Sequence, residues 1–243
     1  DTEQSPTPII SIENLDNYIH DNKVSVKDLY LQISSMGNEK PDIVEGNDLP
    51  DFNPDDEYLQ EIKSPIFYAV QKNINIQTGQ PTILDFDMQR ISQRINIVFN
   101  IRTEGNIKRE DLAAPIIELS GACGRFNIAD ACLDTTRLYR MAHQVQPDEF
   151  TQTGEGTYRC VVHFHTLGVI PSAAKGHLNG PGILQVALQV STPQLDSSGA
   201  PVVDEEGNPV KNSRYIYGAI NPYDELTAAQ LIEVRDGKIY LRY

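Results

Sequence analysis

The clearest metal-binding chemistry in the sequence lies at His163 and His165, which flank Phe164. Residues two apart on a strand share a face, so the two imidazoles would lie about 6.6–7 Å apart. Such a pair chelates a metal ion when a third ligand arrives from a neighbouring strand. No aspartate or glutamate occurs between residues 157 and 172 to supply one. Two exposed histidines on a sheet are therefore the favoured interpretation, and we assign no metal site and no cofactor.

A thiol nucleophile is the second candidate, because Gly121-Ala-Cys123-Gly shares part of the nucleophile-elbow pattern. The second glycine of that pattern is missing at the required spacing. A cysteine hydrolase would also need His143 or His163 as the base and an acid such as Asp130 to orient it. Nothing in the sequence brings these residues together. A tight turn with a buried thiol is favoured, so no catalytic residue is assigned and the chain is predicted not to be an enzyme.

The cysteines do not form a disulfide framework, since there are only three, Cys123, Cys132 and Cys160. Cys123 and Cys132 could pair across a short loop. Small buried thiols are the preferred interpretation, because free cysteine is among the most buried residue types. Cysteine content therefore leaves the cellular compartment open.

Residues 39–61 contain nine acidic side chains and little periodicity. Carboxylates are the ligands that Ca²⁺ prefers, but the spacing of a dedicated calcium loop is absent. Pro41, Gly46, Pro50 and Pro54 interrupt the stretch. These features predict a solvated surface loop or interdomain connection rather than a cation site.

Surface tyrosines raise the alternative of carbohydrate binding. Tyr215 and Tyr217 share one face of a predicted strand, and Tyr223, Tyr240 and Tyr243 follow. Aromatic rings can form platforms for sugars, but tryptophan, which usually contributes to them, is absent. Core packing also explains two tyrosines on one strand face. A carbohydrate- or protein-binding module is kept as the second hypothesis.

Composition excludes several classes of partner. The chain has 243 residues, 40% hydrophobic and 22% charged, with a formal net charge of −14. Such an acidic protein repels nucleic acid and anionic lipid. No apolar run reaches the roughly 18 residues of a membrane-spanning helix, so we expect no membrane insertion by this chain. Because the sequence begins at Asp1 rather than methionine, we expect a processed product or a trimmed piece.

The elements that would position any site are strands. Residues 94–101 give the cleanest pattern, with Ile95, Ile97, Phe99 and Ile101 on one face. Residues 158–165 and 184–190 alternate in the same way. We count about ten or eleven such strands and only a few short helical turns. This pattern predicts an all-β protein made of antiparallel sandwiches.

Several turns connect the predicted strands. Residues 78–81 are predicted to join strands at 73–77 and 82–88, and Asp236-Gly237 is the strongest two-residue hairpin signal in the chain. Asp196 and Asp204 each begin an Asp-x-x-Gly repeat, which predicts tandem turns. The acidic stretch suggests a division into an N-terminal β-domain, residues 1–60 and incomplete in size, and a C-terminal β-sandwich, residues 61–243.

The order of these pieces resembles the fimbrillin superfamily of Bacteroidales surface pili, the type V fimbriae with their anchor and accessory subunits. The resemblance covers roughly residues 60–243 and has no invariant motif. Four stretches carry it: Ser64-Pro-Ile-Phe-Tyr-Ala69, the run from Gln89 to Phe99, Pro115-Ile-Ile-Glu-Leu-Ser-Gly121, and the hairpin ending Gly237-Lys-Ile-Tyr-Leu241.

The resemblance implies two transthyretin-like sandwich domains, export as a lipoprotein precursor, proteolytic trimming, and assembly by strand exchange into a fimbrium attached to the outer membrane. Its partners would be other fimbrial subunits, with host proteins or glycans as further partners in cell adhesion. The predicted donor strand contains Ile232, Val234, Ile239 and Leu241. The predicted acceptor groove contains Ile95, Ile97, Phe99 and Ile101.

The sequence departs from this family in two respects. The part before the acidic stretch is short for a complete first sandwich, and no cysteine lies near Asp1 to carry a lipid anchor. A trimmed stalk or tip-associated subunit is therefore expected rather than a permanently anchored base.

Overall fold

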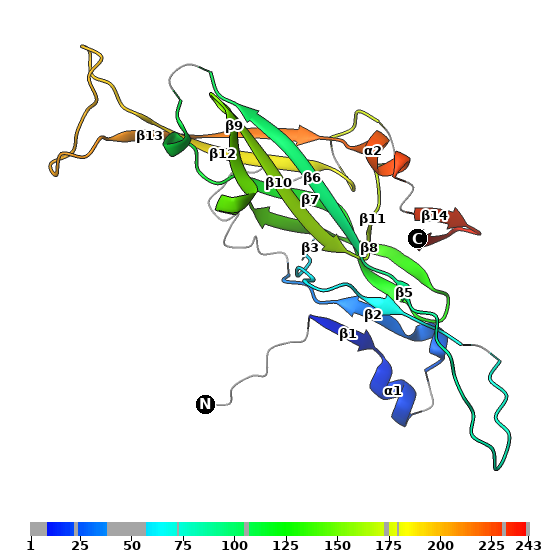
Figure 1. Ribbon diagram of the computed structural model, residues 1–243. Helices are drawn as coiled ribbons and strands as arrows, with labels where there is room; N and C mark the ends of the chain where they lie inside the picture. The colour runs from blue at the N-terminus through cyan, green and yellow to red at the C-terminus, as the bar shows by residue number, and fades with distance from the viewer. Residues whose placement is uncertain are drawn as a thin grey trace, which may run out of the picture.

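The computed structural model describes residues 9–21, 24–37, 57–71, 73–104, 107–172, 175–178, 180–229 and 232–241 (Figure 1). These residues form fifteen strands, two short α-helices and three 3-10 helices. The predicted all-β sandwich is confirmed. Its likeness to transthyretin stays a prediction.

The elements before residue 91 are short. They are β1 (Ile10–Glu13), α1 (Leu15–His20), η1 (Val26–Asp28), β2 (Tyr30–Ile33), β3 (Glu57–Tyr58), β4 (Phe67–Tyr68) and β5 (Gln89–Arg90). The main body follows with β6 (Gln93–Arg102), η2 (Arg109–Asp111), β7 (Ile116–Asn127), β8 (Cys132–Gln144), η3 (Pro147–Glu149), β9 (Phe150–Gly154), β10 (Thr157–Thr166) and β11 (Gly168–Val169). The chain ends with β12 (Leu184–Pro193), β13 (Lys211–Ile220), α2 (Tyr223–Ala228), β14 (Ile232–Arg235) and β15 (Lys238–Leu241).

The long strand β7 is the centre of the larger sheet. One of its edges pairs with β8 along most of its length. The other edge pairs in turn with β12 at residues 116–119, with β11 at residues 122–123 and with β2 at residues 125–127. The β7–β8 register shifts at Gly121 and Gly124. These irregularities bend the strand. β7 pairs with β12 before Gly121, with β11 between Gly121 and Gly124, and with β2 after Gly124.

A smaller sheet, ordered β6-β10-β9, packs over β7 and β8. β10 alternates strictly, with Tyr158, Cys160, Val162 and Phe164 buried. β6 runs antiparallel to it, with Phe99 opposite Cys160 and Ile97 opposite Val162. The period-two pattern that predicted both strands is therefore confirmed.

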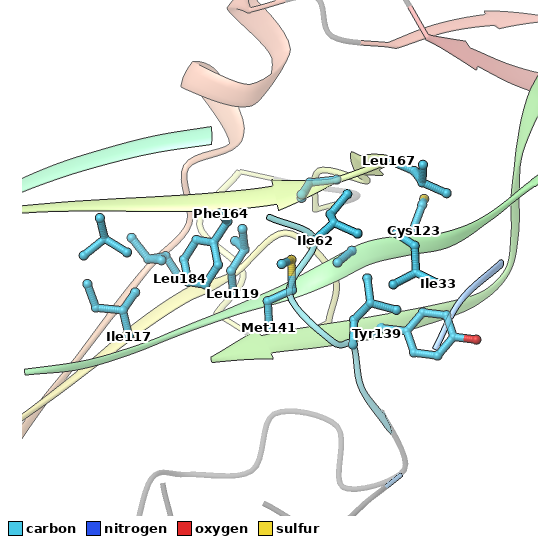
Figure 2. Packing of buried hydrophobic residues seen from close by; sticks show 14 of the residues in the cluster. Ile33, Ile62, Ile117, Leu119, Cys123, Tyr139, Met141, Phe164, Leu167 and Leu184 are labelled. Atoms are coloured by element: carbon cyan, nitrogen blue, oxygen red, sulfur yellow. The ribbon is translucent and has the colours of Figure 1, made fainter. Parts of the chain in front are cut away.

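The space between the two sheets is filled by one continuous apolar core. Figure 2 shows Ile117 and Leu119 of β7, Met141 of β8, Phe164 of β10 and Leu184 of β12 within it. Every one of these side chains is buried. Since such burial contributes roughly 1.5–3 kcal/mol per large apolar side chain, this core is the main source of stability.

The N-terminal elements join the larger sheet. β2 pairs with β7 and β3 pairs with β8, while Ile33 and Leu59 belong to the main core. Residues on both sides of position 60 thus contribute to one sheet and one core. The division into two domains at that position stays a prediction. Most of the acidic stretch, residues 39–56, lies outside the described residues.

Two expectations about local structure were wrong. The structure has no strands at residues 73–77 or 82–88, although the turn between them is present, with Gln80 N–H donating to the Gln77 carbonyl. In the described part of the chain these two legs pair with no strand, and an isolated two-stranded hairpin is at best marginally stable. Gly121-Ala-Cys123-Gly is part of strand β7 rather than a tight turn.

The other turns agree with the sequence. Asp236 and Gly237 both have positive φ, 49° and 73°, as a two-residue type I′ hairpin requires, and they join β14 to β15. Asp196 and Asp204 each accept backbone hydrogen bonds from residues two and four positions ahead. These hydrogen bonds lower the pKa of both carboxyl groups, for Asp196 together with one from the Ser198 hydroxyl.

Candidate functional site

The free edge of β6 is the feature of the structure that best matches a strand-acceptor site. In the described part of the chain, β6 pairs with β10 alone, so its other ten-residue edge has no strand beside it. Ile95, Ile97, Phe99 and Ile101 point to the core but are only half-buried, whereas the facing residues of β10 are fully buried. The predicted acceptor residues therefore share one face at a sheet edge.

The predicted donor residues lie in the hairpin formed by β14 and β15 (Figure 1). The hairpin joins the larger sheet at the Ile239–Leu133 register pair with β8. Leu241 is buried against the core, Ile232 and Ile239 are half-buried, and Val234 is 66% exposed. In this structure the donor candidate thus lies on its own sheet rather than in a neighbour's.

An ion pair links this hairpin to the turn before β8. The Lys238 ammonium lies 2.5 Å from Asp130 Oδ2, a pair that is exposed on both sides. Ion pairs exposed to solvent contribute little to stability. Cys132 precedes Leu133, which is the register partner of Ile239. Burial raises the pKa of the Cys132 thiol, and the nearby charge of Lys238 opposes this increase. We therefore expect the buried Cys132 thiol to become more accessible if the hairpin leaves β8.

The histidine pair lies on the outer face of β10. His163 Nδ1 is 2.7 Å from Asn96 Oδ1 on β6. Burial and then the nearby positive charge of Arg94 lower the pKa of His165. Among the residues that the structure describes, no group of three His, Cys, Asp or Glu side chains could hold a metal ion.

The thiols are placed for packing rather than for catalysis. Cys123, Cys132 and Cys160 are all free and buried, so the Cys123–Cys132 pairing that the sequence left open is not formed. Burial raises the pKa of both the Cys123 and Cys160 thiols to about 12. A nucleophilic thiol needs a lowered pKa and access to substrate, so Cys123 lacks the properties of a catalytic cysteine.

His143, the proposed base, is committed to Glu149 at 2.7 Å. Burial of Glu149 works against its ionisation. Hydrogen bonds from the Gln146 N–H and from His143 outweigh burial, so the pKa of Glu149 is lowered. The pair anchors η3, which leads from β8 into β9.

The raised pKa values predict that the Cys123 and Cys160 thiols react slowly with thiol reagents in the folded state. At about pH 8, Cys123 and Cys160 should react with an aromatic disulfide reagent only after unfolding returns their pKa to about 8.5. Absorbance of the released thiolate, followed with and without denaturant, measures this. Rapid native-state labelling of Cys160, mapped by mass spectrometry, would contradict the burial seen here.

The tyrosines of the carbohydrate hypothesis do share a face of β13. The Tyr215 and Tyr217 rings stack on each other, with centroids 6.0 Å apart and an interplanar angle of 22°. Each ring is more than one third exposed. Stacking turns the ring faces toward each other, so they do not form a flat platform for a sugar. Tyr240 instead contacts the guanidinium of Arg235, and Tyr243 lies outside the described residues.

Sequence reasoning missed two exposed features. One is the loop of residues 73–88, which carries several exposed apolar side chains, and the other is the free edge of β13. The signal for the first was present, because Leu84, Phe86 and Met88 alternate with Asp85 and Asp87. Alternation alone could not tell a half-buried strand from an unpartnered segment.

Comparisons with known proteins give limited information. No protein family and no curated protein matches the sequence. A crystal structure of a candidate adhesin from Bacteroides ovatus is similar over 91% of this chain and 63% of its own, with a TM-score of 0.44 and 8% sequence identity. The chain thus spans less than two thirds of that protein. No helix among the described residues is long and apolar enough to cross a membrane.

Proposed function

We propose that this chain is a non-enzymatic subunit of a surface fimbrium, in the stalk or near the tip, that assembles by β-strand donation and supports cell adhesion. The proposal includes export, proteolytic processing and attachment of the fimbrium to the outer membrane. Other subunits would be its partners, with host proteins or glycans as the adhesion targets. The observation that carries the proposal is the free, half-covered edge of β6.

The acceptor half of the proposal rests on incomplete burial. A ten-residue edge strand offers a row of unpaired N–H and C=O groups. Along β6 these groups lie beside four apolar side chains that β10 and the larger sheet cover only in part. An added strand would pair with the backbone and bury these side chains, which is how strand addition gains both affinity and specificity.

The donor half rests on the apolar face and the partial exposure of the β14–β15 hairpin. Its paired residues place Ile232, Val234, Ile239 and Leu241 on one face. Val234 is 66% exposed. Release of the hairpin would uncover Leu241 and the core-facing parts of Ile232 and Ile239, and burial of the same side chains in another subunit would offset this cost.

A peptide spanning residues 232–243 tests donation without altering the folded chain. We expect the peptide to bind, and hydrogen exchange to slow over residues 93–102. Aspartate at positions 239 and 241 of the peptide should abolish binding, because a charge would then face the apolar residues of β6. Aspartate at positions 238 and 240, on the opposite face, is the matched control and should be tolerated.

The full chain gives the second readout. Val234→Asp should leave the thermal midpoint of the monomer unchanged, since Val234 is 66% exposed, and should prevent the hairpin-driven part of assembly, measured by light scattering as a loss of large species. In assembled material Cys132 should become reactive, because its hairpin has left β8. Assembly that tolerates Val234→Asp and keeps Cys132 protected would show that the hairpin is not the donor.

The second candidate function is a monomeric carbohydrate- or protein-binding module. The exposure of Tyr215 and Tyr217 on β13 favours it, because their hydroxyl groups and ring edges remain available to a partner although their faces do not form a flat platform. It predicts glycan or protein binding that is lost in Tyr215→Ala or Tyr217→Ala, in a chain that stays monomeric at every concentration. The same light-scattering experiment therefore separates the two candidates.

A further inference from the structure

A second interaction element lies in the loop of residues 73–88, here called the arm. The arm projects from the lower right of the molecule in Figure 1. Its large apolar side chains are exposed: Ile74 42%, Ile76 77%, Ile83 82%, Leu84 40%, Phe86 54% and Met88 57%. Soluble monomers seldom expose so many apolar side chains together, and such patches mark interaction sites.

The second leg of the arm, residues 82–88, has the pattern of a strand that lacks a partner. Leu84, Phe86 and Met88 alternate with Asp85 and Asp87, so one face would be apolar and the other acidic. Residues 73–88 contain no lysine or arginine. In the described part of the chain no strand pairs with this leg. The partner that fits it is a sheet edge that is both apolar and basic.

The free edge of β13 has these properties. β13 pairs with β12 alone among the described strands. Ile216 and Ile220 lie opposite the core residues Leu188 and Leu184, but are 46% and 53% exposed. In a chain of net charge −14, β13 carries Lys211 and Arg214 and no acidic residue, and the Lys211 ammonium lies 3.9 Å from Asp111 Oδ1 of the same chain.

The arm and β13 of one molecule do not meet. Figure 1 shows β13 along the upper part of the molecule, whereas the arm extends away from the body at the opposite end. A contact between them therefore requires two molecules. The two surfaces differ, so the contact is heterologous, the kind that can propagate into a filament.

We propose that residues 82–88 of one copy add as a strand to the free edge of β13 in a second copy of this chain. The apolar face of the arm would cover Ile216 and Ile220. Asp85 and Asp87 would then lie on the face of Tyr215, Tyr217 and Lys211, whose hydroxyl and ammonium groups can donate to carboxylates. This contact uses neither β6 nor the C-terminal hairpin, so it goes beyond the strand donation proposed above.

Phe86→Asp in the full chain is the primary test. Loss of one buried aromatic contact should weaken self-association roughly tenfold to hundredfold, as measured by analytical ultracentrifugation. Val203→Asp is the matched control, because Val203 is 55% exposed in a different loop and gains the same charge. Both variants should keep the wild-type thermal midpoint. Equal association of the two variants would overturn the proposal.

A charge exchange tests the partner surface. Asp85→Lys with Asp87→Lys should weaken association, and so should Lys211→Glu, because Lys211 lies on the same face of the proposed contact. The variant with all three changes should recover it, and hydrogen exchange should slow at residues 211–220 on association. Failure of the threefold variant to recover would contradict the pairing.

The arm can be tested separately from hairpin donation. The same series made in the Val234→Asp background removes hairpin-driven assembly. Association that persists there and still depends on Phe86 supports the arm whatever becomes of the proposed donor. If Val234→Asp abolishes association completely, and Phe86→Asp has no effect in the otherwise wild-type chain, the hairpin is supported and the arm is excluded.

Discussion

Glu118→Ala is expected to lower the free energy of unfolding by about 3–5 kcal/mol, the range found when one partner of a buried ion pair is removed. Arg140 Nη1 lies 3.2 Å from Glu118 Oε1, and each side chain is only 4% exposed. The Tyr58 hydroxyl donates to the same oxygen at 2.9 Å. Burial, and then the charge of Glu118, raise the pKa of Tyr58 far above its usual value. Alanine would remove the carboxylate that both the buried Arg140 guanidinium and the buried Tyr58 hydroxyl contact.

Urea denaturation of three variants separates charge from packing. Tyr58→Phe should cost about 1.5–3 kcal/mol, the net value of one hydrogen bond to a charged group, and so less than loss of the carboxylate. Glu118→Leu combined with Arg140→Met should restore most of the loss, since replacing both charges by apolar groups is often neutral. Glu110→Ala is the exposed control, because its pair with Lys108 is 67–73% exposed and 3.8 Å apart. A loss in Glu118→Ala no larger than in Glu110→Ala would show that this pair does not stabilise the fold.

This buried cluster matters for assembly because it holds the Tyr58 side chain of strand β3 against the outer face of the larger sheet. Tyr58 packs there with Ile116 and Ala187, on the side away from the main core. The segment that follows β3 then reaches the core through Leu59 and Ile62. The cluster thus stabilises the body from which both proposed contacts extend, and its loss should unfold the chain rather than change its partners.

Strands with strict alternation could be predicted from the sequence, because one face of each meets the core and the other meets solvent. β6 and β10 satisfy this condition, and the Asp236-Gly237 hairpin was set by local turn chemistry. β8 was not predicted. Its Leu138-Tyr-Arg-Met-Ala142 segment packs against different layers on its two faces, so Tyr139, Arg140 and Met141 are buried in succession. A strand with two covered faces shows no period of two.

The candidate site was predicted only in its parts. The apolar face of β6 could be predicted from the positions of Ile95 to Ile101. The apolar face of the hairpin could be predicted in the same way from the alternation of its own residues. Neither pattern reveals which strand lies at an edge, because pairing order depends on contacts far apart in the sequence. The same limit applies to the arm, whose alternation was recognised although its exposure was not. A tertiary partner, or its absence, decides what such a segment does.

Gly121→Ala is expected to be as damaging as loss of the buried ion pair, at about 3–5 kcal/mol, because strain and a backbone clash act together. Gly121 has φ +80°, a conformation that side chains with a Cβ rarely adopt. A Cβ there would lie 2.5 Å from Gly182 N and 2.8 Å from the Ile170 carbonyl oxygen. Both contacts are with backbone, which a rotamer change cannot relieve.

The position of Gly121 explains why such a residue is required. It is the bulge residue of β7, left unpaired between Ser120, opposite Arg140, and Ala122, opposite Tyr139. Its carbonyl accepts from Ile170 N–H, and the preceding Ser120 carbonyl accepts from Gly182 N–H. The bulge therefore lets one strand pair with β12 before it and with β11 after it. Alanine would force apart the segments that bring β12 beside β7, and β13 is attached to the sheet through β12.

Gly218→Ala is the matched control for this substitution. Gly218 also lies within a strand, but nothing is within 4 Å of the Cβ position and its φ is not in the left-handed region. Its loss should change the free energy of unfolding by less than about 1 kcal/mol. Urea melts of the two variants give the comparison directly. Similar small effects at both positions would mean that β7 can relax around the bulge. A large effect at Gly121 alone would show that the bulge fixes the layer carrying the β13 edge, on which the proposed contact between copies depends.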